Sequence, residues 1–142
     1  MVNTFTCFVA ALIFFLGGCN TGISDKSLTF ISPDDALYAS ENDGFSLLGA
    51  SKPTVIVDSR QHFDYAKSHI ADSISMPYGW LNLHVWRLDD VGTIIVMGET
   101  YNDSASIAMS KSLLEMGFAD VKTLQGGFEA WENAGKPVIT KE

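Results

Sequence analysis

Apolar and polar positions alternate along the chain in short blocks that predict strands and helices in turn. Two blocks, residues 54–57 and 93–97, are rich in β-branched side chains and contain no charged residue. Such blocks are typical of strands that are buried on both faces of a sheet. Shorter runs of the same kind predict further strands at residues 28–31, 72–75 and 121–124.

Helical patterns separate the predicted strands. They occupy residues 61–68, 79–88, 103–116 and 128–133, and Ser32-Pro33-Asp34-Asp35 marks the start of another. In that last segment a serine cap, a proline at the first helical position and two acids in the first turn all favour a helix. Strands that alternate with helices form βαβ units. The pattern therefore predicts an α/β domain with a mostly parallel sheet and helices on both faces.

The first nineteen residues follow a different pattern. An apolar run at residues 5–16 suits the core of an export signal and is short for a transmembrane helix, which needs roughly twenty residues. The run ends in Leu16-Gly17-Gly18-Cys19, which resembles a bacterial lipobox. This resemblance implies a signal peptide at residues 1–18, acylation of Cys19, and an exported protein that is lipid-anchored in the cell envelope.

Two details of this segment bear on that expectation. Asn20 follows the cysteine, and by resemblance to Gram-negative sorting this favours the outer membrane, facing the periplasm. Residues 1–18 contain no Lys or Arg, so a signal without lipidation and a short uncleaved anchor stay open as alternatives. Residues 19–27 are interpreted as a tether, and residues 28–142 as one domain.

The formal net charge of −8 belongs wholly to the chain after residue 18, because the first eighteen residues carry no charged side chain. Nine scattered Lys and Arg residues form no basic stripe, so nucleic acid is not an expected partner. The acidity also disfavours electrostatic docking on anionic lipid, which leaves Cys19 as the expected membrane attachment. His62 and His84 have no spacing relation to a Cys or acidic cluster that would suggest a zinc site. Neither a metal nor a cofactor is expected.

Three motifs follow one another along residues 28–139. They are Asp58-Ser59-Arg60 with the downstream run from His69 to Pro77, the strand–loop–helix at 94–116, and the run Leu124-Gln125-Gly126-Gly127-Phe128-Glu129-Ala130-Trp131. In this order and spacing they resemble the rhodanese family. The resemblance implies a three-layer α/β domain with a mostly parallel five-stranded sheet. It also implies structural roles for five residues of these motifs: Asp58, His69, Gly126, Gly127 and Trp131.

The central loop departs from the pattern of active relatives, which is Cys-x-x-Gly-x-Arg after the fourth strand. Here it reads Gly98-Glu99-Thr100-Tyr101-Asn102-Asp103. The resemblance places Gly98 at the nucleophile position and Asp103 at the usual arginine. A residue without a side chain supplies no thiolate. Two carboxylates beside a bound dianion would also cost on the order of several kcal/mol in a partly buried site.

We therefore expect a catalytically inactive domain that acts as an envelope-anchored binding or scaffold module for an unknown protein partner. The expected binding rim combines the loop with Arg60, Tyr78, Trp80 and Trp86. A second interpretation keeps the domain in sulfur or anion handling, with a partner lending the cysteine. A third is a degenerate paralogue with only a residual structural role.

Several rim residues also have structural interpretations. Arg60 is expected to pair with a neighbouring carboxylate such as Asp58, and Asp103 to cap the helix that follows it. Trp80 and Trp86 are six residues apart, near opposite faces of a regular helix. Half-buried packing is the favoured interpretation of these side chains, and exposure of at least one of them beside a cleft is the alternative. His69 is expected to tie the loop to the sheet through hydrogen bonds.

Overall fold

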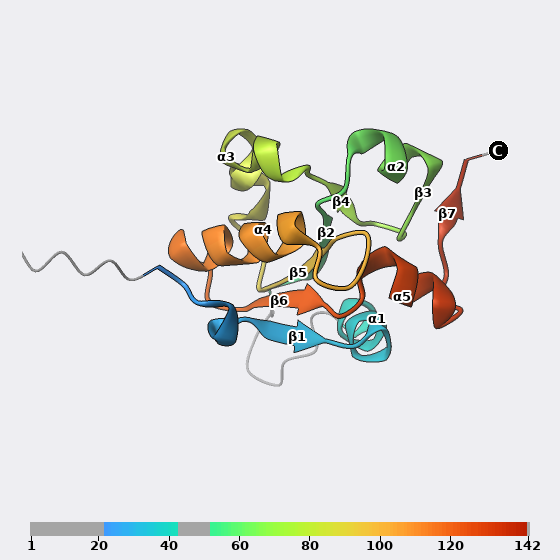
Figure 1. Cartoon of the computed structure of the whole chain (residues 1–142), viewed down its shortest axis with the longest axis horizontal. Coiled ribbons are helices and arrows are strands. Elements are labelled where there is room, and N and C mark those ends of the chain that lie inside the picture. The colour runs from blue at the N-terminus through green and yellow to red at the C-terminus, as the bar shows by residue number, and fades with distance from the viewer. Residues whose placement is uncertain (1–21, 43–51, 142) are drawn as a thin grey trace, which may run out of the picture.

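The computed structural model describes residues 22–42 and 52–141, and its centre is a five-stranded parallel sheet (Figure 1). The strand order is β1-β6-β5-β2-β4, and every neighbouring pair in it is parallel. The strands are β1 (Thr29–Ile31), β2 (Thr54–Asp58), β4 (Ile74–Ser75), β5 (Thr93–Met97) and β6 (Val121–Leu124). The predicted α/β class and the predicted parallel sheet of five strands are confirmed.

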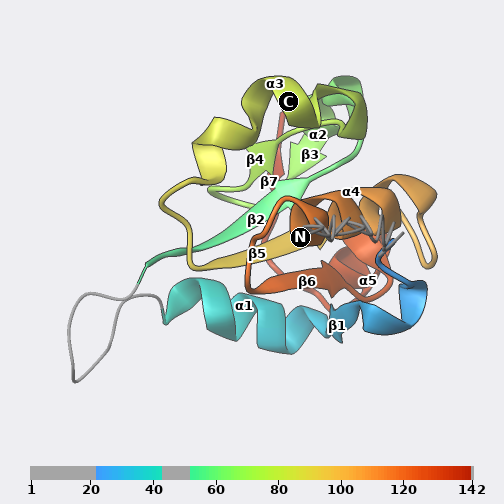
Figure 2. The ribbon, with the colours of Figure 1, turned by 90° about the vertical axis from the view of Figure 1, so that its left-hand side faces the viewer.

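Two hydrophobic clusters cover the two faces of the sheet. One packs residues of α4 (Ser104–Glu115) and of the α3 region, including Met109, Leu113 and Leu81, against the central strands. The other packs α1 (Pro33–Glu41) and α5 (Gly127–Asn133) on the opposite face. Figure 2 shows α1 and α4 on opposite sides of the strands. The short helix α2 (His62–Lys67) buries no residue and lies outside both clusters.

The capping residues that the sequence predicts at the helix ends form the expected hydrogen bonds and backbone conformations. The Ser32 hydroxyl accepts a hydrogen bond from the Asp35 backbone N–H at 3.2 Å, and Pro33 occupies the first turn of α1. Beyond the end of α4, Gly117 has φ 95°, the left-handed conformation that favours glycine at such a cap. Phe118 then packs back against the cluster on the α4 face.

Two parts of the fold differ from the expectation. The helix predicted at residues 79–88 is a series of three short pieces: the 3₁₀ turn η2 (Tyr78–Trp80), α3 (Leu81–His84) and the 3₁₀ turn η3 (Val85–Leu88). The sequence pattern also missed an antiparallel pair, β3 (Ser68–His69) with β7 (Ile139–Thr140), because strands of two residues carry no periodicity.

The described chain begins against α4. The Ile23 backbone N–H donates to Glu115 Oε1 at 3.3 Å, Asp25 forms an ion pair with Lys111, and residues Asp25–Ser27 form a 3₁₀ turn. Part of the predicted tether is thus held on the domain. The predicted signal peptide and Cys19 lie outside the described residues. Among the described residues, no helix is long and apolar enough to cross a membrane.

Replacement of Leu113 tests the packing of α4 on the sheet. Leu113 is fully buried in the α4 cluster, whereas Leu83 is 71% exposed and serves as the matched control. Leu113→Ala is expected to lower the free energy of unfolding by about 2–5 kcal/mol, because it leaves a cavity in a packed core. Leu83→Ala should change it by less than about 0.5 kcal/mol. Urea unfolding followed by circular dichroism measures both, and equal losses would contradict the packing described here.

Candidate functional site

The loop of residues 98–103 joins β5 to α4 at the carboxyl ends of the parallel strands, where α/β folds commonly bind ligands (Figure 1). Gly98 is buried, and the next four residues are exposed. The carbonyl groups of Gly98 and Glu99 accept hydrogen bonds from the backbone N–H groups of Phe128 and Glu129, at 2.8 and 3.0 Å. The loop therefore uses donors of the first turn of α5 for its own backbone.

This close approach explains the paired glycines of the third sequence motif. A Cβ added at Gly127 would lie 2.6 Å from the Gly98 carbonyl oxygen, and one at Gly126 would lie 2.5 Å from the Ala130 side chain. Both glycines also have positive φ, 62° for Gly127 and 78° for Gly126. Trp131 is fully buried below them and donates from Nε1 to the Pro137 carbonyl oxygen at 3.0 Å.

The side chain of Asp103 occupies the space next to Gly98. An ideal Cβ at position 98 would stand 2.5 Å from Asp103 Cγ and 2.6 Å from both its Cβ and its Oδ1. No real side chain tolerates such distances, so residue 98 gains a side chain only when Asp103 moves or shrinks. Two of the three departures from the loop pattern, Gly98 and Asp103, lie five positions apart in the sequence and therefore compete for one space.

Asp103 is also the N-cap of α4. Its Oδ1 accepts a hydrogen bond from the Ser106 backbone N–H at 2.9 Å, and the Ser106 hydroxyl donates to the Asp103 carbonyl oxygen at 2.9 Å. The predicted cap is confirmed. A carboxylate here also interacts favourably with the positive end of the helix dipole. The Asp103 carboxylate therefore occupies the N-terminal end of α4, which faces the loop, where a bound anion would otherwise lie.

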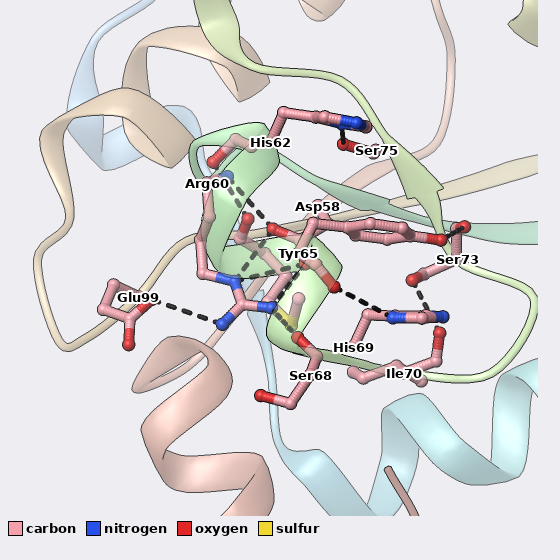
Figure 3. Close-up of polar contacts among 12 residues, drawn as sticks. Asp58, Arg60, His62, Tyr65, Ser68, His69, Ile70, Ser73, Ser75 and Glu99 are labelled. Carbon is pink, nitrogen blue, oxygen red and sulfur yellow. Dashed lines mark hydrogen bonds and ion pairs between the residues drawn. The ribbon is translucent and has the colours of Figure 1, made fainter. Parts of the chain in front are cut away.

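Arg60 is the cation next to the loop, and protein groups surround it (Figure 3). Its Nε and Nη2 bond the two carboxylate oxygens of Asp58 at 3.0 and 2.8 Å, so the predicted pair is present. Nη2 also donates to the Ser68 carbonyl oxygen at 2.7 Å, and Nη1 lies 3.3 Å from Glu99 Oε2. The guanidinium carbon sits 3.7 Å from the ring centroid of Phe128.

Burial alone would lower the pKa of Arg60, but the hydrogen bonds and the charge of Asp58, together with Glu99, raise it. The guanidinium is therefore charged at any physiological pH. Its charge is matched by Asp58, which is itself fully buried, and by Glu99. Little of the positive charge is left for a bound anion.

Two hollows flank the loop. The first has a volume of about 250 Å³ and is lined by Arg60, by the carboxylates of Asp64, Glu99 and Asp103, and by small or neutral residues. The sequence interpretation missed Asp64, which enters this hollow because α2 begins directly after Arg60. The second hollow, of about 170 Å³, lies on the other side of the loop between Tyr101, Phe30 and Ile107. Three acids beside one paired arginine make the first hollow unsuited to a dianion.

His69 and the aromatic rim residues lie away from the loop. The His69 ring bonds the Tyr65 carbonyl oxygen through Nδ1 at 2.9 Å and stacks on the Tyr65 ring (Figure 3). The expected hydrogen-bonding role of His69 is therefore confirmed, but its partner differs from the expectation: the ring ties β3 to α2 and not the loop to the sheet. Tyr78, Trp80 and Trp86 line neither hollow. Trp80 is 48% exposed, as half-buried packing predicts, whereas Trp86 is 65% exposed, so that prediction is wrong for Trp86. In the part of the chain that the structure describes, no cluster of His, Cys, Asp and Glu could hold a metal ion.

Comparison with known proteins finds one matching domain family and several similar curated proteins. A model of the rhodanese-like domain matches residues 45–134. Thiosulfate sulfurtransferase GlpE of Actinobacillus pleuropneumoniae serotype 7 (strain AP76) is 30% identical over 115 residues, which cover 81% of this chain and 96% of that protein. GlpE of Coxiella burnetii (strain RSA 493 / Nine Mile phase I) is 31% identical over 78 residues, covering 55% of this chain and 71% of that protein.

Solved structures share the same fold. Thiosulfate sulfurtransferase from Pseudomonas aeruginosa superposes with a TM-score of 0.66 at 21% identity, over 81% of this chain and 20% of that one. A rhodanese-related protein from Thermoplasma volcanium superposes with a TM-score of 0.61 at 22% identity, over 80% of this chain and 99% of that one.

A double-mutant cycle tests the shared space of Gly98 and Asp103. Gly98→Cys alone is expected to lower the free energy of unfolding by about 1–3 kcal/mol, because it overpacks the loop. In an Asp103→Gly background the same change should cost much less, since glycine removes the clashing atoms and weakens the cap by only a few tenths of a kcal/mol. Urea unfolding measures all four chains.

Asp103→Asn is the matched control of this cycle. It keeps the volume of the side chain and can still cap α4, so Gly98→Cys should remain costly beside it. An equal cost of Gly98→Cys in the aspartate, asparagine and glycine backgrounds would contradict the overlap.

Proposed function

The chain belongs to the rhodanese-like domain family and is related to sulfurtransferases, and from this premise we propose that it is a member without sulfurtransferase activity. In this proposal the domain serves as a binding module at the bacterial cell envelope. The observation that carries the loss of activity is the space beside Gly98, which Asp103 fills. The residue that the family motif places at the nucleophile position thus has no side chain and no room for one.

The charges around the loop support the same proposal. Sulfur transfer in this fold would need converging N–H donors to stabilise a cysteine thiolate and then the anionic outer sulfur of the persulfide formed on it. Here Asp103 caps the helix that would face such an anion, and Glu99 and Asp64 add two more carboxylates to the hollow. Arg60 is already paired with Asp58 and Glu99.

The alternative proposal keeps anion handling and takes the cysteine from a partner protein. It needs an anion to bind this loop while the partner supplies the thiolate. The acidic lining of the hollow argues against it, because each carboxylate close to a dianion raises the cost of binding. The two proposals therefore differ in whether small anions stabilise the fold.

Sulfur transfer from thiosulfate to cyanide by the purified full-length chain tests the proposal directly. We expect no turnover above the uncatalysed rate, because a chain with glycine at position 98 forms no persulfide there. Turnover by the wild-type chain would overturn the proposal. In the same samples, thiosulfate, sulfite and phosphate at millimolar concentration should leave the melting temperature unchanged; a rise would favour the anion-handling alternative by mass action.

The envelope location rests on Leu16-Gly17-Gly18-Cys19 behind the apolar run of residues 5–16. In this proposal the signal is removed, Cys19 becomes the first residue, and its acyl chains hold the domain on the outer membrane, facing the periplasm. More than one acyl chain gives stable attachment without a spanning helix. Residues 22–27, of which Asp25 pairs with Lys111, would then join the anchor to the domain.

Labelling with radioactive palmitate in a Gram-negative host tests the anchor. The chain has two cysteines, so Cys7→Ser is a matched control for Cys19→Ser. The wild-type chain and Cys7→Ser should both incorporate label and sediment with the membranes, because the signal that contains Cys7 is discarded. Cys19→Ser should lose the label. Label retained in Cys19→Ser, or lost in Cys7→Ser, would contradict the proposed acylation site.

A further inference from the structure

Strand β1 is the last strand on one side of the sheet, and in the described part of the chain no strand pairs with its outer edge (Figure 1). The Ile31 carbonyl oxygen accepts a hydrogen bond from the Gln125 backbone N–H at 2.8 Å, so the backbone of Ile31 faces β6. Because the backbone groups of neighbouring residues in a strand point to opposite sides, the N–H and C=O of Phe30 face the open edge. This edge therefore offers a donor and an acceptor to another extended chain.

The side chains of β1 alternate between the two faces of the sheet. Ile31 packs against the cluster that contains residues of α1 and α5, whereas Phe30 lines the hollow of about 170 Å³ on the α4 face and is 49% exposed. The strand contains no charged residue and no proline, which commonly protect an exposed edge against pairing. The composition of β1 therefore leaves its edge open to a partner strand.

The hollow beside Phe30 has the size of one side chain. Its walls include Tyr101 of the loop and Ile107 of α4. The Tyr101 ring lies over Gly126, where an added Cβ would stand 3.3 Å from Cδ2, and its hydroxyl is tied to Gln125. Sites for small-molecule ligands usually have about 300–1,000 Å³, whereas an apolar cavity of about 150 Å³ holds one benzene molecule. The hollow therefore suits one aromatic or branched aliphatic side chain better than a metabolite.

The open edge and the hollow can serve the same partner. Side chains that lie opposite each other on neighbouring strands are about 4.5–5.5 Å apart. A strand that pairs with β1 therefore places one side chain next to Phe30, on the face of the sheet that carries the hollow. Backbone pairing and insertion of an apolar side chain are thus available to a single extended segment.

The charges around the edge bear on the composition of that segment. Two ion pairs beside β1 are balanced; they are Asp25–Lys111 and Asp34–Lys136. Among the described residues, Asp35 after β1 and Asp103 in the hollow form no ion pair with a cation, and Lys26 before β1 forms none with a carboxylate. The unpaired carboxylates outnumber the unpaired lysine, so the edge complements a basic segment better than an acidic one.

We propose that β1 is a docking edge, which pairs with an extended segment of a partner protein. The segment inserts one aromatic or branched aliphatic side chain between Phe30, Tyr101 and Ile107 and carries basic residues near it. Main-chain hydrogen bonds supply the attachment, and the hollow supplies the selectivity. This inference deepens the proposed binding role and rests on it. It does not involve the hollow that contains Arg60, which lies on the other side of the loop.

A fluorescent peptide tests the docking edge on the purified full-length chain in detergent. The peptide is acetyl-Lys-Thr-Val-Phe-Val-Thr-Lys-amide, and fluorescence anisotropy measures its binding. We expect saturable binding that weakens by about tenfold or more when alanine replaces the peptide's Phe, because a buried aromatic ring is lost. Replacing both Lys residues of the peptide by Glu should also weaken it. Equal or tighter binding of the Glu peptide would contradict the proposed composition of the partner.

Methyl groups on the peptide nitrogens test the backbone pairing without any change to the protein. Only every second N–H of an added strand faces β1. N-methylation of one alternate set of residues should therefore abolish binding, whereas methylation of the other set should leave most of it. Equal effects of the two sets would overturn the pairing.

Two variants of Phe30 test the same contact from the side of the protein. Phe30→Pro and Phe30→Ala both lose the ring, but only proline also loses the N–H that faces the open edge, a position where edge strands tolerate proline. Phe30→Pro should bind the peptide several-fold more weakly than Phe30→Ala, because it lacks one backbone hydrogen bond. Equal affinities would contradict the pairing. Circular dichroism checks that both variants fold, and the methylated peptides decide the question if the proline variant does not.

The assay of sulfur transfer separates failure of this inference from failure of the proposed function. A chain that neither transfers sulfur nor binds the peptide at millimolar concentration keeps the proposed loss of activity and refutes the docking edge. A chain that transfers sulfur refutes the proposed function, whatever the peptide does. Self-association of the wild-type chain that is lost in Phe30→Pro but kept in Phe30→Ala would assign the edge to a second copy and overturn the proposed partner.

Discussion

A buried charge has to be neutralised by groups around it, and the arrangement near the loop follows from how Arg60 meets this requirement. Its partners come from β2 (Asp58), from the start of β3 (the Ser68 carbonyl) and from the loop (Glu99), while Phe128 of α5 covers its face. One side chain therefore holds four separate parts of the chain in register. Removing a partner from such a buried pair costs far more than the pair itself contributes, so this centre cannot easily be released to bind a ligand.

The backbone around this centre is equally constrained. The Gly98 and Glu99 carbonyls reach the first turn of α5 only because Gly127 has no side chain to block them. The loop therefore rests on α5 from one side, while Asp103 caps α4 from the other. Two carbonyl groups at the start of the loop and the Asp103 carboxylate at its end therefore serve the fold. The loop presents exposed side chains to solvent, among them Tyr101, which is tied to Gln125.

Much of the fold could be predicted from local patterns. The two uninterrupted apolar strands, the Ser32 cap and the left-handed Gly117 each depend on residues within one segment, and each appears where expected. The sequence did not predict the elements whose conformation depends on contacts with distant parts of the chain. The 79–88 segment alternates between 3₁₀ and α geometry, and β3 pairs with a strand some seventy residues later.

The site shows the same division. The Arg60–Asp58 pair and the Asp103 cap are short-range and could be predicted, whereas His69 bonds its own neighbouring helix and does not reach the loop. The overlap of Asp103 with the missing side chain at 98 depends on how the loop turns, with Asn102 in the left-handed region at φ 58°. The sequence alone gives no signal from which this overlap could be predicted.

That overlap has a consequence for the history of the chain. A cysteine restored at position 98 alone meets the side chain of Asp103, so it fits only when Asp103 moves or is replaced as well. Replacing Asp103 alone removes its hydrogen bond to the start of α4 and leaves position 98 without a thiol. A return to the family loop therefore takes at least two coordinated changes, which single substitutions do not readily deliver.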